Sequence, residues 1–334
     1  MKKFSLWLAG LVAVIITMVG LHAQATQAAT GASFTVAPIL TSNQVGMDNG
    51  YFNLLLKPGQ KQTVAVKVTN LTNKTKNIRV EPINAGTSDN VQVMYDAGVP
   101  RDSSAQYRLT DLLDKGVTVK LPASTTQQVK FTLTTPKNGF RGVILGAIHA
   151  EDLASYSSGG KGVQVKNRFA MNIGVMAQTS SKQVAPELKM HKVGAHAQSH
   201  QAMVTARLQN TQPRMFGKLK IKAKVTRQGR SDAILKQTNT NLSVAPNSHF
   251  DYRMISKKAL RPGNYTLTLT ATSHQWRWHF NRNFSITREQ AAKINKEANL
   301  KTEIPWMWII IGVLAAIILI LIVLLIVMMR RRKA

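Results

Sequence analysis

The sequence lacks cysteine and is poor in acidic residues. Its 334 residues include no Cys, and 15 Asp and Glu stand against 44 Lys and Arg. Without cysteine the chain forms no disulfide, so packing alone must hold its folds together, and thiol nucleophiles and thiolate metal ligands are excluded. The shortage of acidic residues leaves a net charge of +29, which attracts anionic partners without identifying them.

That charge is unevenly distributed. Residues 31–179 hold 16 basic and 9 acidic residues, whereas residues 180–303 hold 22 basic and 6 acidic ones. The second half therefore generates the stronger positive field and is the half in which we expect an anionic partner to bind.

A long uncharged apolar run occupies 306–329 and is followed at once by basic residues. As a helix rising about 1.5 Å per residue, it is long enough to cross the hydrocarbon core of about 30 Å, whereas a buried core helix is usually shorter and carries a polar stripe. We expect a transmembrane helix over 304–329 and a cytoplasmic tail over 330–334, because basic flanks stay inside. The expected interface anchors are Trp306, Trp308, Arg330, Arg331, Arg332 and Lys333.

The first 29 residues have the layout of a signal peptide. Lys2 and Lys3 precede an apolar run over 4–21, and small residues follow around Ala23, Ala25 and Ala28. This order is typical of a cleaved export signal, and an uncleaved second anchor is the alternative. Either arrangement places the domains outside the membrane, on the side of the cell wall, where nucleic acid is not an expected partner.

The residues between these segments predict an all-β protein. Short alternating runs separated by turn residues recur from 33 to 152 and again from 163 to 288; TVAVKVTN is one example. We expect two tandem β-sandwiches of immunoglobulin-like size at those ranges. The Ser- and Gly-rich stretch over 153–162 is expected to link them, and 289–303 has the composition of a short juxtamembrane helix or stalk.

An ordered set of segments carries a family resemblance. FTVAPI, YFNLLLKPGQ, VTNLTNKT and GFRGVILGAIHAED are followed by VAPELKMHKV, LQNTQP, VAPNSHFDY, LRPGNYTLTLTA and WRWHFNRNFSIT. Together they resemble the two domains of the WxL-interacting protein family of Gram-positive bacteria. The resemblance implies a peptidoglycan-binding domain, then a host-binding domain that recognises extracellular-matrix proteins, and a partnership with secreted WxL-domain proteins. It supplies no catalytic residues and no cofactor.

Four lysines are the first candidate binding residues. Lys218, Lys220, Lys222 and Lys224 alternate with apolar residues, so in a strand all four fall on one face at intervals of about 6.6 Å. They are either a solvated face, or lysines that protect an edge strand from aggregation, or a surface for an anionic protein or wall polymer.

An aromatic strand is the second candidate. Trp276 and Trp278 alternate with Arg277 and His279, so one face is aromatic. It forms either the packed edge of a core or a platform for a carbohydrate or peptide.

Two groups of histidines are candidate metal or acid–base sites. His149 with Glu151 and Asp152 could serve a metal or acid–base chemistry, although alternation sends the two carboxylates to opposite faces. His191, His196 and His200 lie across an expected turn without an acidic neighbour. No Gly-x-Ser-x-Gly elbow occurs. We therefore expect neither a metal site nor an enzyme.

The sequence thus predicts a membrane-anchored, non-enzymatic surface scaffold for adhesion. An extracytoplasmic chaperone that holds exported subunits at a sheet edge is the alternative.

Overall fold

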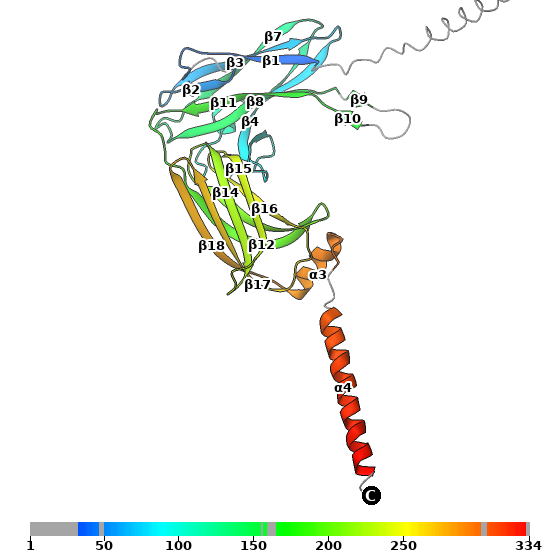
Figure 1. Cartoon of the computed structure of the whole chain (residues 1–334). Coiled ribbons are helices and arrows are strands. Elements are labelled where there is room, and N and C mark those ends of the chain that lie inside the picture. The colour runs from blue at the N-terminus through cyan, green and yellow to red at the C-terminus, as the bar shows by residue number, and fades with distance from the viewer. Residues whose placement is uncertain (1–32, 47–49, 155, 159–164, 302–305, 332–334) are drawn as a thin grey trace, which may run out of the picture.

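The computed structural model describes residues 33–46, 50–154, 156–158, 165–301 and 306–331. Strands dominate it, and they form two units with separate hydrophobic cores, followed by helices α3 and α4 (Figure 1). The predicted all-β class is confirmed. The expected signal peptide, 1–29, lies outside the described residues.

The first unit packs two sheets around one core. One sheet has the strand order β1-β3-β7, and the other has the order β2-β11-β8-β4-β5 with β6 also paired to β4. The bounds are β1 (Phe34–Ile39), β2 (Phe52–Leu55), β3 (Lys61–Asn70), β4 (Lys76–Thr87), β5 (Val93–Asp96), β6 (Val117–Leu121), β7 (Thr126–Thr134), β8 (Val143–Asp152) and β11 (Ala170–Gln178), with the short helix α2 (Leu109–Leu112). Val64, Val66 and Val68 of β3 are fully buried, as their alternate spacing predicts.

Strand β11 pairs with strands of the first unit. The sequence places 153–162 as a linker and assigns 170–178 to the second sandwich. In the structure β11 pairs antiparallel with β8 and parallel with β2, and β9 (Tyr156–Ser158) pairs with β10 (Val165–Asn167). Of the expected linker, 155 and 159–162 lie outside the described residues, and the described chain after them returns to the first sheet through β11. Composition alone cannot separate a flexible linker from a hairpin turn, because both favour Ser and Gly.

The second unit also packs two sheets face to face. Their orders are β12-β13-β16 and β15-β14-β17-β18. The bounds are β12 (Leu188–Gln198), β13 (Gln201–Asn210), β14 (Phe216–Arg227), β15 (Ala233–Val244), β16 (Ser248–Ser256), β17 (Gly263–Ser273) and β18 (Trp276–Ile286). Leu219, Ile221 and Val225 of β14 are fully buried in the core between the sheets.

Helix α3 (Arg288–Glu297) packs on the second unit and is not a free stalk. It begins at Thr287, whose side chain accepts a hydrogen bond from the N–H of Gln290 in a capping box. Ala291 and Ile294 are buried in the second core. At its end the side chain of Asn295 donates to the carbonyl of Leu260 and accepts from the N–H of Leu260, both at 2.8 Å.

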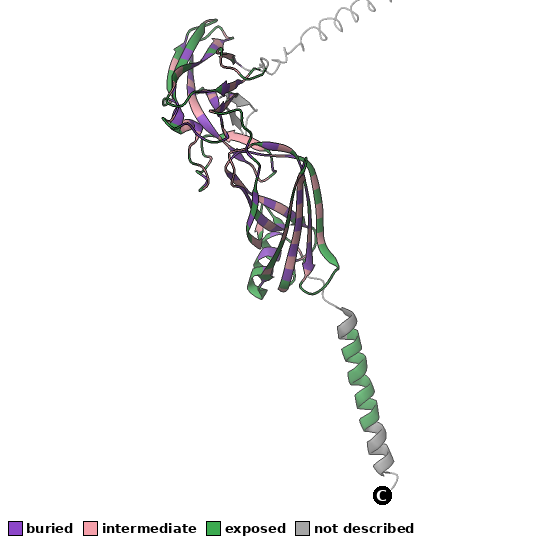
Figure 2. Cartoon of the chain, turned by 90° about the vertical axis from the view of Figure 1, so that its left-hand side faces the viewer, coloured by how far each residue is buried: buried purple, intermediate pink, exposed green. Residues whose placement is uncertain are grey.

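Helix α4 (Trp306–Arg331) follows. Its described side chains, from Ile310 to Val323, are exposed and apolar (Figure 2). Within the part of the chain that the structure describes, no helix is long and apolar enough to cross a membrane. Of the expected interface anchors, the side chains of Trp306, Trp308, Arg330 and Arg331 are outside that part, as are Arg332 and Lys333 altogether.

Candidate binding surfaces and the joint between the units

The four lysines of β14 point away from the second core. Lys218, Lys220 and Lys222 are exposed and Lys224 is partly exposed, while the residues between them are buried. Strand β14 lies between β15 and β17, so it is an internal strand. The interpretation that these lysines protect a sheet edge therefore does not apply.

The pairing register defines a larger basic face on this sheet. Lys224 is opposite Lys236 of β15, and Lys222 and Lys220 continue through β17 threonines to His279 and Arg277 of β18. No Asp or Glu occurs in the four strands. None of the four lysines has an ion-pair partner among the described residues. Like charges directly opposite one another destabilise a sheet, and a bound anion would relieve that repulsion.

The aromatic side of β18 faces the core. Trp278 lies 5.6 Å from Phe216 between ring centroids, and Phe284 stacks on Tyr265 at 5.6 Å. Trp276 and Trp278 are both partly buried. This arrangement favours packing over a ligand platform, since the rings already have apolar neighbours.

The first histidine group does not assemble a chemical site. Asp152 is fully buried and its Oδ2 lies 2.7 Å from Nζ of Lys76. Glu151 pairs instead with Arg168, and His149 Nδ1 lies 2.7 Å from the side-chain oxygen of Asn172. Strand alternation separates the two carboxylates, as the sequence predicts.

The second histidine group is also dispersed. His191 Nε2 lies 2.7 Å from the side-chain oxygen of Gln209, and His196 contacts Thr205. His200 is exposed at the turn between β12 and β13. Over the described residues no group of three His, Cys, Asp or Glu side chains is placed to hold a metal ion.

The joint between the two units is a feature that the sequence did not reveal. The loop between β4 and β5 of the first unit inserts into the second unit, and Val91 at its tip is 3% exposed within the second core. The N–H of Ser243 donates to the Val91 carbonyl at 3.0 Å. Val91 has a φ of +56°, which β-branched residues rarely adopt and which persists only where the surroundings impose it. A first-unit residue therefore completes the core of the second unit.

Polar contacts flank this insertion. Thr87 Oγ1 lies 2.6 Å from Oγ of Ser248 and accepts from the N–H of Ala245 at 3.0 Å. Asp89 forms an ion pair with Arg253. On the other side of Val91, the N–H of Val93 donates to Oγ of Ser243 at 3.1 Å, so each side of the loop is bonded to the second unit.

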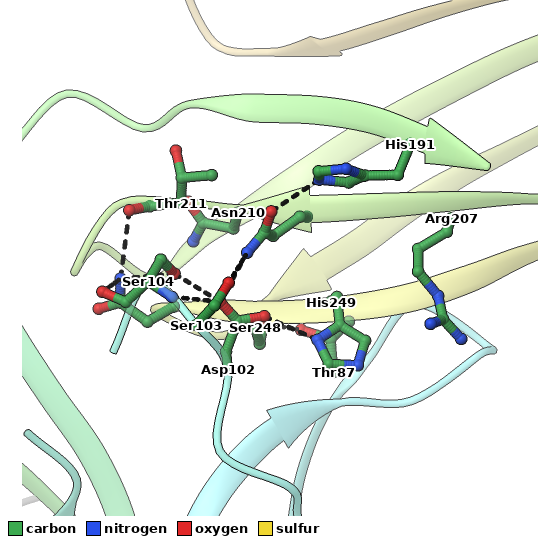
Figure 3. A network of polar contacts seen from close by, with 12 residues as sticks. Thr87, Asp102, Ser103, Ser104, His191, Arg207, Asn210, Thr211, Ser248 and His249 are labelled. Carbon is green, nitrogen blue, oxygen red and sulfur yellow. Dashed lines mark hydrogen bonds and ion pairs between the residues drawn. The ribbon is translucent and has the colours of Figure 1, made fainter. Parts of the chain in front are cut away.

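Asp102 is the centre of a second set of contacts across the joint (Figure 3). It is 4% exposed and accepts hydrogen bonds from Nε2 of Gln209 at 2.7 Å and from Oγ of Ser104 at 2.6 Å. Its Oδ2 lies 2.7 Å from Nδ1 of His249. Beside it, Nδ2 of Asn247 donates to the Ser104 carbonyl at 3.0 Å. Side chains from β13 and β16 therefore converge on one carboxylate of the first unit.

The surroundings of Asp102 set its charge. Burial opposes ionisation, but hydrogen bonds from Ser104, His249 and Gln209 outweigh it, so the pKa of the Asp102 carboxyl lies below its usual value. The carboxylate is therefore ionised at neutral pH.

Local sequence could not have located these contacts. Asp102 and His249 are 147 positions apart, and each lies in a polar loop or alternating strand of ordinary composition. The only signal is the isolated Val91 in the polar run TSDNVQ, which would ordinarily be taken for a turn.

Two family models match consecutive stretches of the chain. Residues 34–152 match the peptidoglycan binding domain of WxL Interacting Protein, and residues 160–296 match the host binding domain of WxL Interacting Protein. Among curated proteins, none matches the sequence.

Solved structures give weaker similarities. A chaperone–tip adhesin complex of CFA/I fimbriae matches at 10% identity over 75% of this chain and 98% of that one, with a TM-score of 0.31. A Salmonella enterica SafA pilin complex with the SafB chaperone matches at 11% identity over 76% and 98%, with a TM-score of 0.29.

Proposed function

The chain belongs to the WxL interacting protein family, and from that membership we propose that it is a non-enzymatic binding scaffold of the cell surface. The first unit binds peptidoglycan. The second unit holds a further partner, and the joint fixes the geometry between the two binding sites. The order of the two matched domains, each of a binding family, carries this proposal.

Membrane anchoring is part of the proposal. The run over 306–329 is uncharged and is followed by four basic residues, and α4 is helical through it. We place α4 in the membrane with the basic tail in the cytoplasm and both units on the cell-wall side. The signal peptide is removed after export. We propose that both units are immunoglobulin-like β-sandwiches.

The basic face is the proposed site for the second partner. Its lysines have no carboxylate neighbour on the four strands, so an acidic surface would gain attraction without displacing an internal ion pair. A secreted WxL-domain protein is the partner that family membership suggests. A host extracellular-matrix protein or an anionic wall polymer would bind the same lysines.

Co-sedimentation with purified peptidoglycan tests the first part. Residues 33–301 should pellet with sacculi stripped of anionic polymers, and should do so at 0.5 M salt, since exposed charges are screened beyond roughly 4–5 Å at that ionic strength. Binding that disappears at high salt would mean that net charge alone attaches the protein to the wall.

A further inference from the structure

The far end of the second unit holds a cavity of about 650 Å³ lined by the β14–β15 hairpin, the loop between β16 and β17, and the chain after α3. Its cations are Arg227, Lys257, Lys258, Arg261 and Lys301. No Asp or Glu lines it. None of the five cations is in an ion pair with a described residue. The nearest acidic residue in sequence, Asp232, precedes the lining residue Ala233 and is not part of the wall.

The loop between β16 and β17 is held rigidly. Ser256 Oγ donates to the carbonyl of Lys258 at 2.7 Å, and the Tyr265 hydroxyl donates to the carbonyl of Arg261 at 2.5 Å. Asn295 of α3 bonds both backbone groups of Leu260. Three cations are thus presented from a backbone that is already ordered, so a ligand would not have to order it on binding.

The cavity also has an apolar wall. Ile234 is 44% exposed, and Leu235 and Leu300 line the same space. Arg227 lies over the Tyr265 ring, 5.7 Å from its centroid, which leaves its guanidinium at the cavity. A small inorganic anion would contact only the cations, whereas an amphipathic ligand would contact both the cations and the apolar wall.

The cavity is also close to α4 along the chain. Lys301 lines it, and α4 begins at Trp306, so the five Cα–Cα steps between these two residues span about 18 Å at most. If α4 lies in the membrane, Lys301 at the cavity wall is within about 18 Å of the outer end of that helix, which is within reach of the headgroup layer. Basic groups at that depth attract anionic lipids.

From these observations we infer that the cavity binds the headgroup and upper acyl region of an anionic phospholipid, which would fix the tilt of both units on the membrane. This inference rests on the proposed anchoring by α4. The phosphate meets the cations of the loop, and the apolar wall at Ile234 meets the glycerol and first methylenes.

The test uses the full chain in detergent and measures lipid binding by native mass spectrometry. Probes are phosphatidylglycerol, phosphatidylcholine and glycerol 1-phosphate. The cavity variant is Lys257→Gln/Lys258→Gln/Arg261→Gln. The matched control, Lys218→Gln/Lys220→Gln/Lys222→Gln, removes the same charge from the basic face.

The wild-type protein and the control should bind phosphatidylglycerol alike and in preference to phosphatidylcholine, and the cavity variant should bind it about tenfold more weakly or worse. Ile234→Ser should weaken phosphatidylglycerol binding but not glycerol 1-phosphate binding. Equal phosphatidylglycerol binding by the cavity variant and the control would overturn the inference. Competition by glycerol 1-phosphate as strong as that by the lipid would assign the site to a soluble phosphate.

Two further readouts separate this inference from the proposed function. Retention of the chain in membranes after alkaline carbonate extraction tests α4, and peptidoglycan co-sedimentation tests the first unit. If both succeed while the cavity variant binds lipid normally, only the lipid site is wrong.

Discussion

Asp102 of the first unit and His249 of the second lie 2.7 Å apart, measured from Oδ2 to Nδ1. Because Gln209 of the second unit also donates to this carboxylate, Asp102 holds two strands of its neighbour. Together with the inserted Val91, this contact joins the two units.

Removing the charge of Asp102 should weaken the joint. In Asp102→Asn the amide offers one acceptor oxygen where the carboxylate offers two, so the donors of Gln209 and His249 compete for it. We expect a loss of about 1–3 kcal/mol in the free energy of unfolding, measured by denaturant titration. Asp232→Asn is the control, since Asp232 is exposed. A loss no greater than that of the control would mean that Asp102 does not hold the units together.

The same carboxylate predicts acid sensitivity. The pKa of Asp102 is lowered in the folded protein, so its stabilising contribution is complete above its unfolded value of about 3.9 and is lost as the pH falls through the folded value. Asp251, whose pKa is lowered chiefly by its hydrogen bond with Arg207, acts in the same direction. The melting temperature should fall below about pH 4, and less steeply in Asp102→Asn than in the wild type. Parallel pH profiles for the two proteins would contradict this.

Val91 should couple the unfolding of the two units. Val91→Ala leaves a small cavity in the second core and should cost about 1–2.5 kcal/mol. Val91→Asp would bury a carboxylate there and should expel the loop. Calorimetry should show one transition for the wild type and two for Val91→Asp. A single transition in both would show that the loop insertion does not couple the units.

The lysines of the basic face should reduce stability while they support binding. Lys224 faces Lys236 across the β14–β15 pair, so Lys224→Gln should stabilise the fold by roughly 0.2–1 kcal/mol. The same change should weaken retention on a polyanion column. Replacing Lys218, Lys220, Lys222 and Lys224 together with Glu should abolish that retention with the fold intact. Unchanged retention in the folded Glu variant would leave the row as a solvated face.

Fragment boundaries should follow β11. A fragment of residues 33–180 contains β11 with both of its neighbours, whereas a fragment ending at 155 leaves β8 and β2 unpaired on that side. We expect cooperative unfolding by circular dichroism for the longer fragment only. Equal cooperativity of the two fragments would show that β11 is dispensable to the first unit.

The sequence predicted features that depend on neighbouring residues, and it did not reveal contacts between residues far apart in the chain. The alternation of lysines with Leu219 and Ile221 predicts which face of β14 is buried, because successive side chains in a strand point to opposite faces of the sheet. The position of β14 inside its sheet depends on partners that are up to 52 residues away, such as Thr272 opposite Lys220, and alternation does not encode it. The joint at Asp102 and Val91 was missed for the same reason. In contrast, family membership was recognisable, because many short segments in a fixed order identify it without any knowledge of contacts.

The central claim is that each unit binds its own partner, peptidoglycan by the first and an anion by the basic face. Co-sedimentation of residues 33–301 with sacculi stripped of anionic polymers tests it most directly when wild type is compared with the variant in which the four β14 lysines are replaced by Gln. The account predicts equal pelleting of the two proteins at both 0.15 and 0.5 M salt, with weaker polyanion retention in the variant. Loss of pelleting in the Gln variant would contradict it, because the wall would then be bound by the charge of the second unit.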